Sequence, residues 1–161
     1  MIIVSNTTPL IGLASIGRFD LLRQLFGEIY IPSAVYAEAV VRGHEEGGAK
    51  QEVSQAIWIK AKPVQDRLAV DVLLDELDLG EAETIVLARE LNANWVLMDE
   101  RKGRRKLTQL TLPTIGTLGL LLKAKQAGFL PTLRPELERL RQQGFSISQA
   151  VIDAVLKQAQ E

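Results

Sequence analysis

Several apolar runs of this sequence each end at, or lead directly into, side chains that can bind a cation. Asn6 follows the opening apolar run, Glu38 lies in the helix after the second run, Glu81 opens a later helix, and Asp99 follows a four-residue apolar run. In open α/β sheets the loops after the strands build the site, so these side chains are expected to converge. Clustered carboxylates bind divalent cations, and this predicts chemistry on phosphodiesters.

Each of these residues also has a purely structural interpretation. Glu38 is either a ligand or a solvated residue on its helix. Glu81 and Glu83 both lie in a first helical turn, where the helix dipole favours any acid by roughly 0.3 to 1 kcal/mol. Asp99 and Asn6 both precede predicted helices and can act as N-caps. The residue types alone leave both interpretations open.

A dense basic cluster directly follows Asp99. It consists of Arg101, Lys102, Arg104 and Arg105, followed by Lys106. Cations that bind backbone phosphates beside acids that hold a metal suit a nuclease, and we expect the first four to contact RNA phosphates. The alternative is a solvated face of the predicted helix.

Composition excludes several other classes of site. The 161 residues contain no Cys, which excludes disulfides, thiolate catalysis and Cys-ligated zinc. The net charge of −1 indicates that any nucleic-acid contact depends on a local basic patch. The first residues are too short for a signal-peptide core, and apolar runs fall short of membrane-spanning length. We therefore expect a cytoplasmic protein without a membrane partner.

Strand-like and helical patterns alternate along the chain, which favours a mostly parallel sheet covered on both faces. Predicted strands lie at residues 1–5, 29–31, 57–61, 95–98 and 113–115. Predicted helices include residues 10–26, broken by Gly12 and Gly17, one starting at Ser33, and 81–91, 101–110, 117–127, 135–143 and 148–160. Residues 42–48 form the most loop-like segment, and His44 within it is expected to be a surface residue. We predict one domain over 1–161, with 129–161 as a C-terminal helical extension.

Five segments in this order resemble the PIN-domain superfamily and cover most of the chain up to about Gly128. They are Val4-Ser5-Asn6-Thr7-Thr8-Pro9-Leu10-Ile11, Ile31-Pro32-Ser33-Ala34-Val35-Tyr36-Ala37-Glu38, Leu79-Gly80-Glu81-Ala82-Glu83-Thr84, Val96-Leu97-Met98-Asp99-Glu100-Arg101-Lys102-Gly103-Arg104 and Ile115-Gly116-Thr117-Leu118-Gly119. More narrowly, the segments resemble a branch of small prokaryotic PIN-like nucleic-acid-binding proteins.

This resemblance implies a three-layer α/β/α fold and an Mg²⁺- or Mn²⁺-dependent endoribonuclease similar to VapC-type toxins. It implies metal binding by Asn6, Glu38, Glu81 and Asp99, with the three acids as the catalytic residues. Asn6 departs from the pattern, which usually has Asp there. An amide oxygen can ligate a hard cation but brings no negative charge. The alternative is therefore a catalytically weakened or inactive PIN-fold module that binds RNA or protein.

Further expectations concern residues around the metal and the partners. Thr7, Glu83, Glu100 and Thr117 are expected to support the ligands or replace one of them, and Thr117 is also the predicted N-cap of its helix. The resemblance implies RNA as substrate, a small antitoxin as a partner, and a homodimer. A third possibility is a structural or oligomerising domain that uses its C-terminal helices as the interface.

Overall fold

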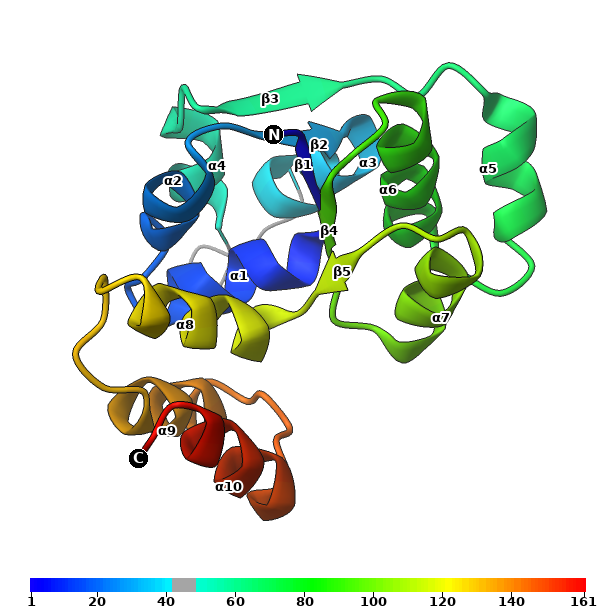
Figure 1. Cartoon of the computed structure of the whole chain (residues 1–161). Coiled ribbons are helices and arrows are strands. Elements are labelled where there is room, and N and C mark those ends of the chain that lie inside the picture. The colour runs from blue at the N-terminus through cyan, green and yellow to red at the C-terminus, as the bar shows by residue number, and fades with distance from the viewer. Residues whose placement is uncertain (42–48) are drawn as a thin grey trace.

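The computed structural model describes residues 1–41 and 49–161, so the predicted loop at 42–48 and His44 lie outside the described residues. Five strands form one parallel sheet in the order β3-β2-β1-β4-β5. The strands are β1 (Ile3–Ser5), β2 (Ile29–Pro32), β3 (Ile59–Lys62), β4 (Trp95–Leu97) and β5 (Thr114–Ile115). The strand order reverses at β1, because the chain builds outward first through β2 and β3 and then through β4 and β5 (Figure 1).

Helices cover both faces of this sheet, which confirms the predicted three-layer α/β/α architecture (Figure 1). The helical segments are α1 (Thr7–Ser15), α2 (Leu21–Phe26), α3 (Ser33–Tyr36), the π-helical turn η1 (Ala37–Val41), α4 (Lys50–Gln55), α5 (Arg67–Leu73), α6 (Leu79–Glu90), α7 (Arg101–Gln109), α8 (Thr117–Gln126), α9 (Arg134–Gln142) and α10 (Gln149–Gln158).

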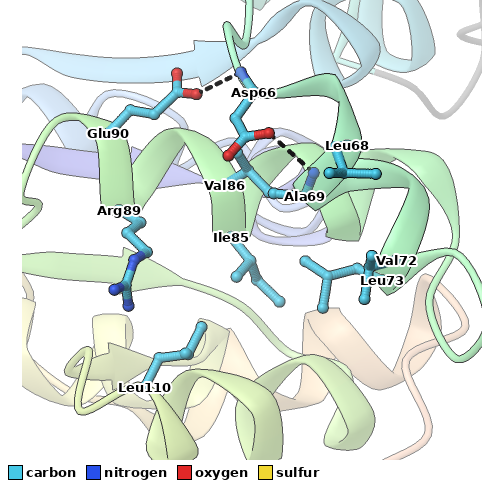
Figure 2. Close-up of a pocket in the computed structure, with 10 residues that line it drawn as sticks. All are labelled: Asp66, Leu68, Ala69, Val72, Leu73, Ile85, Val86, Arg89, Glu90 and Leu110. Atoms are coloured by element: carbon cyan, nitrogen blue, oxygen red, sulfur yellow. Dashed lines mark hydrogen bonds between the residues drawn. The ribbon is translucent and has the colours of Figure 1, made fainter.

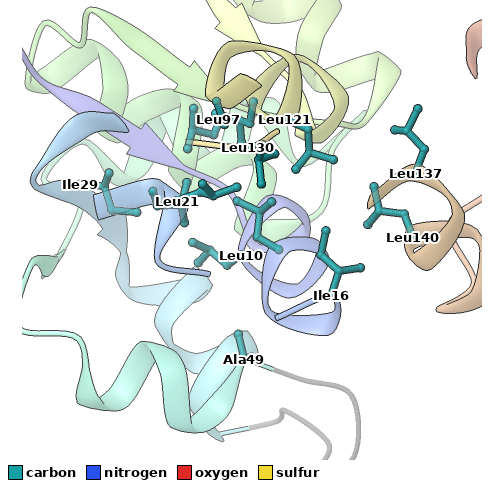
Figure 3. Close-up of a cluster of buried hydrophobic side chains, with 14 of the residues drawn as sticks. Leu10, Ile16, Leu21, Ile29, Ala49, Leu97, Leu121, Leu130, Leu137 and Leu140 are labelled. Carbon is teal, nitrogen blue, oxygen red and sulfur yellow. The ribbon is translucent and has the colours of Figure 1, made fainter. Parts of the chain in front are cut away.

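The central strands separate two apolar cores because successive side chains point to opposite faces. Ile3 and Leu97 join a core with α1, α2 and α8, part of which is shown in Figure 3. Val4, Val96 and Met98 face the other core, built with α5, α6 and α7. Both faces of β1 and β4 are therefore buried, as the continuous apolar runs predicted for central strands of a parallel sheet.

Two helix boundaries differ from the sequence prediction. The predicted break at Gly12 is wrong, because Gly12 lies inside α1 and its bare backbone contacts the ring of Phe145. The break near Gly17 is confirmed: Gly17 has a φ of 72°, a conformation that favours glycine. The predicted N-cap of α8, Thr117, is also wrong. Gly116 is the N-cap, so the side chain of Thr117 is available for another contact.

The C-terminal helices α9 and α10 bury apolar side chains in the same core as α1 and α8. Leu137 and Leu140 of α9 lie beside that core in Figure 3. Polar contacts reinforce this packing: Arg18, after α1, donates to the buried Glu136 at 2.7 Å. Lys125 of α8 donates to Glu161 at 2.8 Å. The helical extension is thus held along α1 and α8.

Within residues 1–41 and 49–161, each helix is too short or too polar to cross a membrane.

Candidate active site

The candidate site lies where β1 and β4 end side by side. The two strands pair in parallel register with Ser5 opposite Leu97, and the backbone N–H of Asn6 donates to the Leu97 carbonyl at 2.9 Å. The residues after β1 therefore face the residues after β4. This is the point of strand-order reversal, where open α/β sheets bind ligands.

The three residues that follow β1 contact two acids from distant segments. Thr7 Oγ1 donates to Glu38 Oε2 at 2.5 Å, and Thr8 Oγ1 donates to Glu100 Oε1 at 2.6 Å. Asn6 is the N-cap residue of α1, yet its Nδ2 donates to Glu100 Oε2 at 3.0 Å. The Asn6 side chain therefore serves the acidic cluster instead of capping its helix.

Asp99 is held by the start of α8. Its Oδ1 accepts from the Thr117 backbone N–H at 2.7 Å, and its Oδ2 accepts from Thr117 Oγ1 at 2.7 Å. The N-cap of α7 is Glu100. The structural interpretation of Asp99 as the cap of α7 therefore fails: its carboxylate binds the N-terminus of α8, 18 residues further along the chain.

Glu81 lies at the N-terminus of α6, and the Glu38 carboxylate packs against the same turn. Asp78 and Glu81 form a capping box in which each side chain accepts from the other residue's backbone N–H at 2.8 Å. A Cβ atom at Gly80 would collide with the Glu38 carboxylate. Glycine at position 80 therefore allows the Glu38 carboxylate to lie against the first turn of α6. Glu38 itself lies on a π-helical turn, a rare geometry that is frequent at functional sites.

Negative charge accumulates in this region. Burial raises the pKa of Asp99, the hydrogen bonds from Thr117 partly oppose this shift, and the charge of Glu100 adds to it. Burial also raises the pKa of Glu81; the hydrogen bond from the Asp78 backbone opposes this shift, and the charges of Asp78 and Glu100 add to it. Glu100 thus acts on acids from two separate segments. A bound cation would favour the charged forms of both carboxyls.

The donor chemistry of this cluster fits a hard divalent cation. Carboxylates of Glu38, Glu81, Asp99 and Glu100, with the amide oxygen of Asn6, are the ligand types that Mg²⁺ and Mn²⁺ accept. Within residues 1–41 and 49–161, no three Asp, Glu or His side chains form a preassembled metal cage. Mg²⁺ usually keeps several waters and takes only one or two carboxylates. The residues therefore fit a partly hydrated ion.

Glu83, the predicted substitute ligand, makes two hydrogen bonds to other helices. Its Oε1 accepts from the Ala34 backbone N–H at 2.9 Å, and its Oε2 accepts from Arg67 at 2.7 Å. These contacts join α6 to the start of α3 and to α5. Both carboxylate oxygens of Glu83 thus serve packing between helices.

The basic residues of α7 line two different cavities, and Arg105 lines both of them. Arg101, Arg104 and Arg105 line a cavity of about 440 Å³ together with Asp99. Arg104 also donates to the Met98 carbonyl at 3.0 Å. Lys102 lines a different, smaller hollow. Three of the four predicted phosphate contacts therefore adjoin Asp99, and the fourth does not.

Sequence inspection missed two glycines that shape the site. Gly80 admits Glu38, as described above. At Gly116, a Cβ would lie 2.8 Å from Asp99 Oδ1 and 3.0 Å from Arg104 Nη1. The only signal for either is its position directly before a predicted ligand or supporting residue. Such a signal does not distinguish a glycine that a side chain must approach closely from a glycine at an ordinary helix start.

A larger cavity of about 630 Å³ lies away from these acids, between α5, α6 and α7 (Figure 2). Its walls are mostly apolar, including Val72 and Ile85. Its acids are already bound to backbone: Glu90 accepts from the Asp66 N–H at 2.8 Å, and Asp66 caps α5. Size alone would select this cavity, but the convergent polar groups are at the ends of β1 and β4.

Comparison with protein-family models gives a match to the PIN domain over residues 2–161. No curated protein gave a significant match to the chain. The family match spans nearly the entire sequence, including the C-terminal helices. The parallel sheet with helices on both faces agrees with the three-layer α/β/α fold that the resemblance implied. The chain therefore belongs to the PIN-domain family.

Proposed function

We propose that the protein is a cytoplasmic, Mg²⁺- or Mn²⁺-dependent endoribonuclease. The observation that carries this proposal is the convergence of acids around the end of β1. Thr7 binds Glu38, 31 residues away, and Asn6 and Thr8 both bind Glu100, more than 90 residues away. PIN domains generally use divalent metals, and this cluster supplies suitable oxygen ligands.

In this proposal Glu38, Glu81, Asp99 and Asn6 would hold the ion, some of them through the waters that Mg²⁺ keeps. When bound, a divalent ion lowers the pKa of a water and stabilises charge on phosphate oxygens. Thr117 fixes both oxygens of Asp99 through two hydrogen bonds, and Thr7 fixes one oxygen of Glu38. Glu100 is the alternate ligand, since it lies within reach of Asn6 and raises the pKa of Asp99.

RNA binding would depend on the cavity shared by Asp99 and the basic face of α7. Arg101 and Arg105 are exposed and line this cavity, so both can contact phosphates without losing an internal partner of the fold. Removing one phosphate contact of this kind reduces the magnitude of the slope of log affinity against log salt concentration by about one unit. Arg104 is more constrained because it also binds the Met98 carbonyl.

The second candidate is a binding module with weak or absent catalysis. It is favoured by one contact, the bond from Asn6 Nδ2 to Glu100. The neutral amide N–H donates a hydrogen bond to a carboxylate whose charge a cation would otherwise balance. Such a protein would bind RNA or a protein partner through the same surface.

The test is cleavage of single-stranded RNA by the purified protein in Mg²⁺ or Mn²⁺, with Asp99→Asn and Asp75→Asn compared. Asp75 is exposed on the segment before α6, so its variant makes the same chemical change away from the site. The nuclease proposal predicts cleavage by wild type and by Asp75→Asn, with a loss of at least 100-fold in Asp99→Asn. RNA binding without cleavage in all three proteins would favour the binding module.

We propose further that the nuclease is the toxin of a toxin–antitoxin pair. Expression should then arrest growth, and Asp99→Asn should relieve the arrest while Asp75→Asn should not. Equal toxicity of wild type and Asp99→Asn would refute the proposal that toxicity comes from RNA cleavage. Co-expression of a small protein encoded beside this chain should restore growth.

A homodimer remains part of this proposal. Exposed apolar side chains on α5, namely Leu68 and Val72, are 74% and 64% exposed and offer a surface for a second copy. Sedimentation of wild type and Leu68→Glu tests this. A dimer that becomes a monomer in the variant supports the proposal, and a monomeric wild type contradicts it.

A further inference from the structure

A second cavity at Asp99 lies between the starts of α1 and α8 and the C-terminal helices α9 and α10. Its volume is about 450 Å³, and Thr8, Asp99 and Thr117 line one end. The opposite wall comes from the segment that joins α9 to α10, with Phe145, Ser146 and Ile147. We call this cavity the α9–α10 groove.

Asp99 lines both the α9–α10 groove and the basic cavity on α7. A chain with a phosphate beside Asp99 would therefore continue into both cavities. One of them presents arginines, which suit phosphates. The other presents apolar walls and hydroxyl groups but no Lys or Arg among its lining residues. The two cavities thus differ in the part of a nucleotide that they suit.

The groove has the size and lining of a site for a flat organic ring. Small-molecule sites typically have volumes of about 300 to 1,000 Å³, with apolar walls and a few polar groups. Leu118, Phe145 and Ile147 supply apolar and aromatic surface, and the hydroxyl of Ser146 can donate or accept at a ring edge. Stacking of a base on an aromatic side chain contributes about 1–3 kcal/mol.

The wall of the groove is held in place before any ligand binds. The Phe145 ring packs on α1 so closely that a Cβ at Gly12 would lie 2.8 Å from its Cζ atom. Arg141 donates to the Ile147 carbonyl at 3.0 Å, and Ser148 caps α10 by accepting from Val151 N at 3.2 Å. A wall ordered in this way reduces the entropy lost on binding.

We propose that the α9–α10 groove binds the base of a nucleotide next to the phosphate at Asp99, in a single-stranded RNA. This inference rests on the proposed function for its choice of ligand, and it goes further by assigning the C-terminal helices a role in binding. The groove binds a base on one side of Asp99, while the arginines of α7 bind phosphates on the other.

The test combines a groove-filling variant with removal of single bases from the RNA. Affinity for a short single-stranded RNA is measured by fluorescence anisotropy in EDTA, so that binding is read without cleavage. The same RNA is then tested with one abasic ribose at each position. Ser146→Trp fills the groove from an exposed position, and Ser54→Trp makes the same change on the exposed surface of α4.

For wild type and Ser54→Trp, we expect one position at which loss of the base weakens binding about 10-fold, the lower part of the range for one stacked base. Ser146→Trp should bind the intact RNA about 10-fold more weakly, and loss of that base should then have no further effect. Thermal unfolding of each variant shows whether it is folded.

Equal affinity of Ser146→Trp and wild type for intact RNA overturns the inference, even if wild type cleaves RNA. The inference is also overturned if an abasic ribose weakens binding to wild type equally at every position of the RNA. Position-specific loss that disappears in Ser146→Trp supports it, even if the cleavage test fails. Loss of self-association in Ser146→Trp with unchanged RNA affinity would assign the groove to a second copy of this chain instead.

Discussion

Replacing Asn6 by Asp tests how the site balances charge. Asn6 is 4% exposed, and its Nδ2 lies 3.0 Å from Glu100 Oε2. In Asn6→Asp a neutral donor becomes a second carboxylate facing Glu100. Two like charges about 4 Å apart repel by on the order of 4 kcal/mol at an effective dielectric constant near 20. Loss of a hydrogen bond to a charged group adds about 1.5–3 kcal/mol, and rotation or protonation of one carboxyl relieves part of this total.

Without metal at pH 7, we therefore expect Asn6→Asp to lower the free energy of unfolding by about 2–4 kcal/mol, which corresponds to a fall in Tm of roughly 4–16 °C. The repulsion raises the pKa of the paired carboxyls in the folded state. The destabilisation is then present above the raised pKa and disappears as the pH falls below the unfolded value near 4. The gap in Tm from wild type should close on acidification.

Mn²⁺ should reverse the effect, because the added carboxylate supplies the charge that the amide lacks. A ligand at 100 times its Kd stabilises the folded state by about 2.7 kcal/mol. We expect a larger rise in Tm with Mn²⁺ for Asn6→Asp than for wild type, and tighter binding by calorimetry. The matched control is Asn94→Asp, which lies at the other end of β4 and whose side-chain oxygen accepts from Ile2 N at 2.6 Å.

The reasoning would be refuted if Asn6→Asp, without metal, melted at the temperature of wild type and gained no more from Mn²⁺. It would also fail if Asn94→Asp gained as much from Mn²⁺, since the effect would then be nonspecific. No Mn²⁺ binding by wild type, with clear binding by Asn6→Asp, would identify Asn6 as the residue that silences the site.

Three further substitutions separate stability from ligand binding. Without metal at pH 7, Asp99→Asn should be at least as stable as wild type in urea unfolding, because burial raises the pKa of Asp99 and an amide removes the buried charge. The difference in stability should shrink as the pH falls through the raised pKa of Asp99. A variant less stable than wild type at pH 7 would contradict this prediction. Gly80→Ala should change the unfolding free energy by less than about 1 kcal/mol. It should weaken Mn²⁺ binding measured by calorimetry, because the added Cβ displaces the Glu38 carboxylate. Unchanged Mn²⁺ affinity would count against Glu38 as a ligand. Glu136→Gln should lower the unfolding free energy by about 1–3 kcal/mol, because the buried carboxylate accepts from two partly exposed arginines at 2.7 and 3.0 Å. Urea unfolding identical to wild type would show that these ion pairs do not anchor α9.

The alternation of apolar runs and helical patterns was sufficient to predict the parallel sheet and its helical layers. Strands buried on both faces have to be apolar along their length, so β1 and β4 are recognisable from the sequence alone. Polar residues directly after such strands lie at the carboxyl edge of the sheet, whatever the details of packing. For this reason Asn6 and Asp99 could be placed at the same edge of the sheet from the sequence alone.

The partner of each acid depended on the tertiary structure. Asp99 was predicted either to bind metal or to cap the helix after it, but its carboxylate accepts from Thr117 at the start of α8. The sequence offered Asn6 as a cap of α1, and its side chain instead reaches Glu100. Hydrogen bonds between segments 18 and 94 residues apart depend on how the strands are ordered, and no local pattern encodes that order.

The choice between Glu81 and Glu83 was also decided by packing. Residues two apart in a helix do not share a face. The residue types did not distinguish them, and only the resemblance singled out Glu81, with Glu83 as the substitute. The packing of α6 brings Glu83 to Ala34 and Arg67, and it brings Gly80, the residue before Glu81, against the Glu38 carboxylate. The sequence alone determined the strands, the helices and the supply of acids at one edge. The packing of α6, α8 and the π-helical turn determined which of those acids meet, because close contact between side chains depends on helix rotation and on space that a single Cβ can fill.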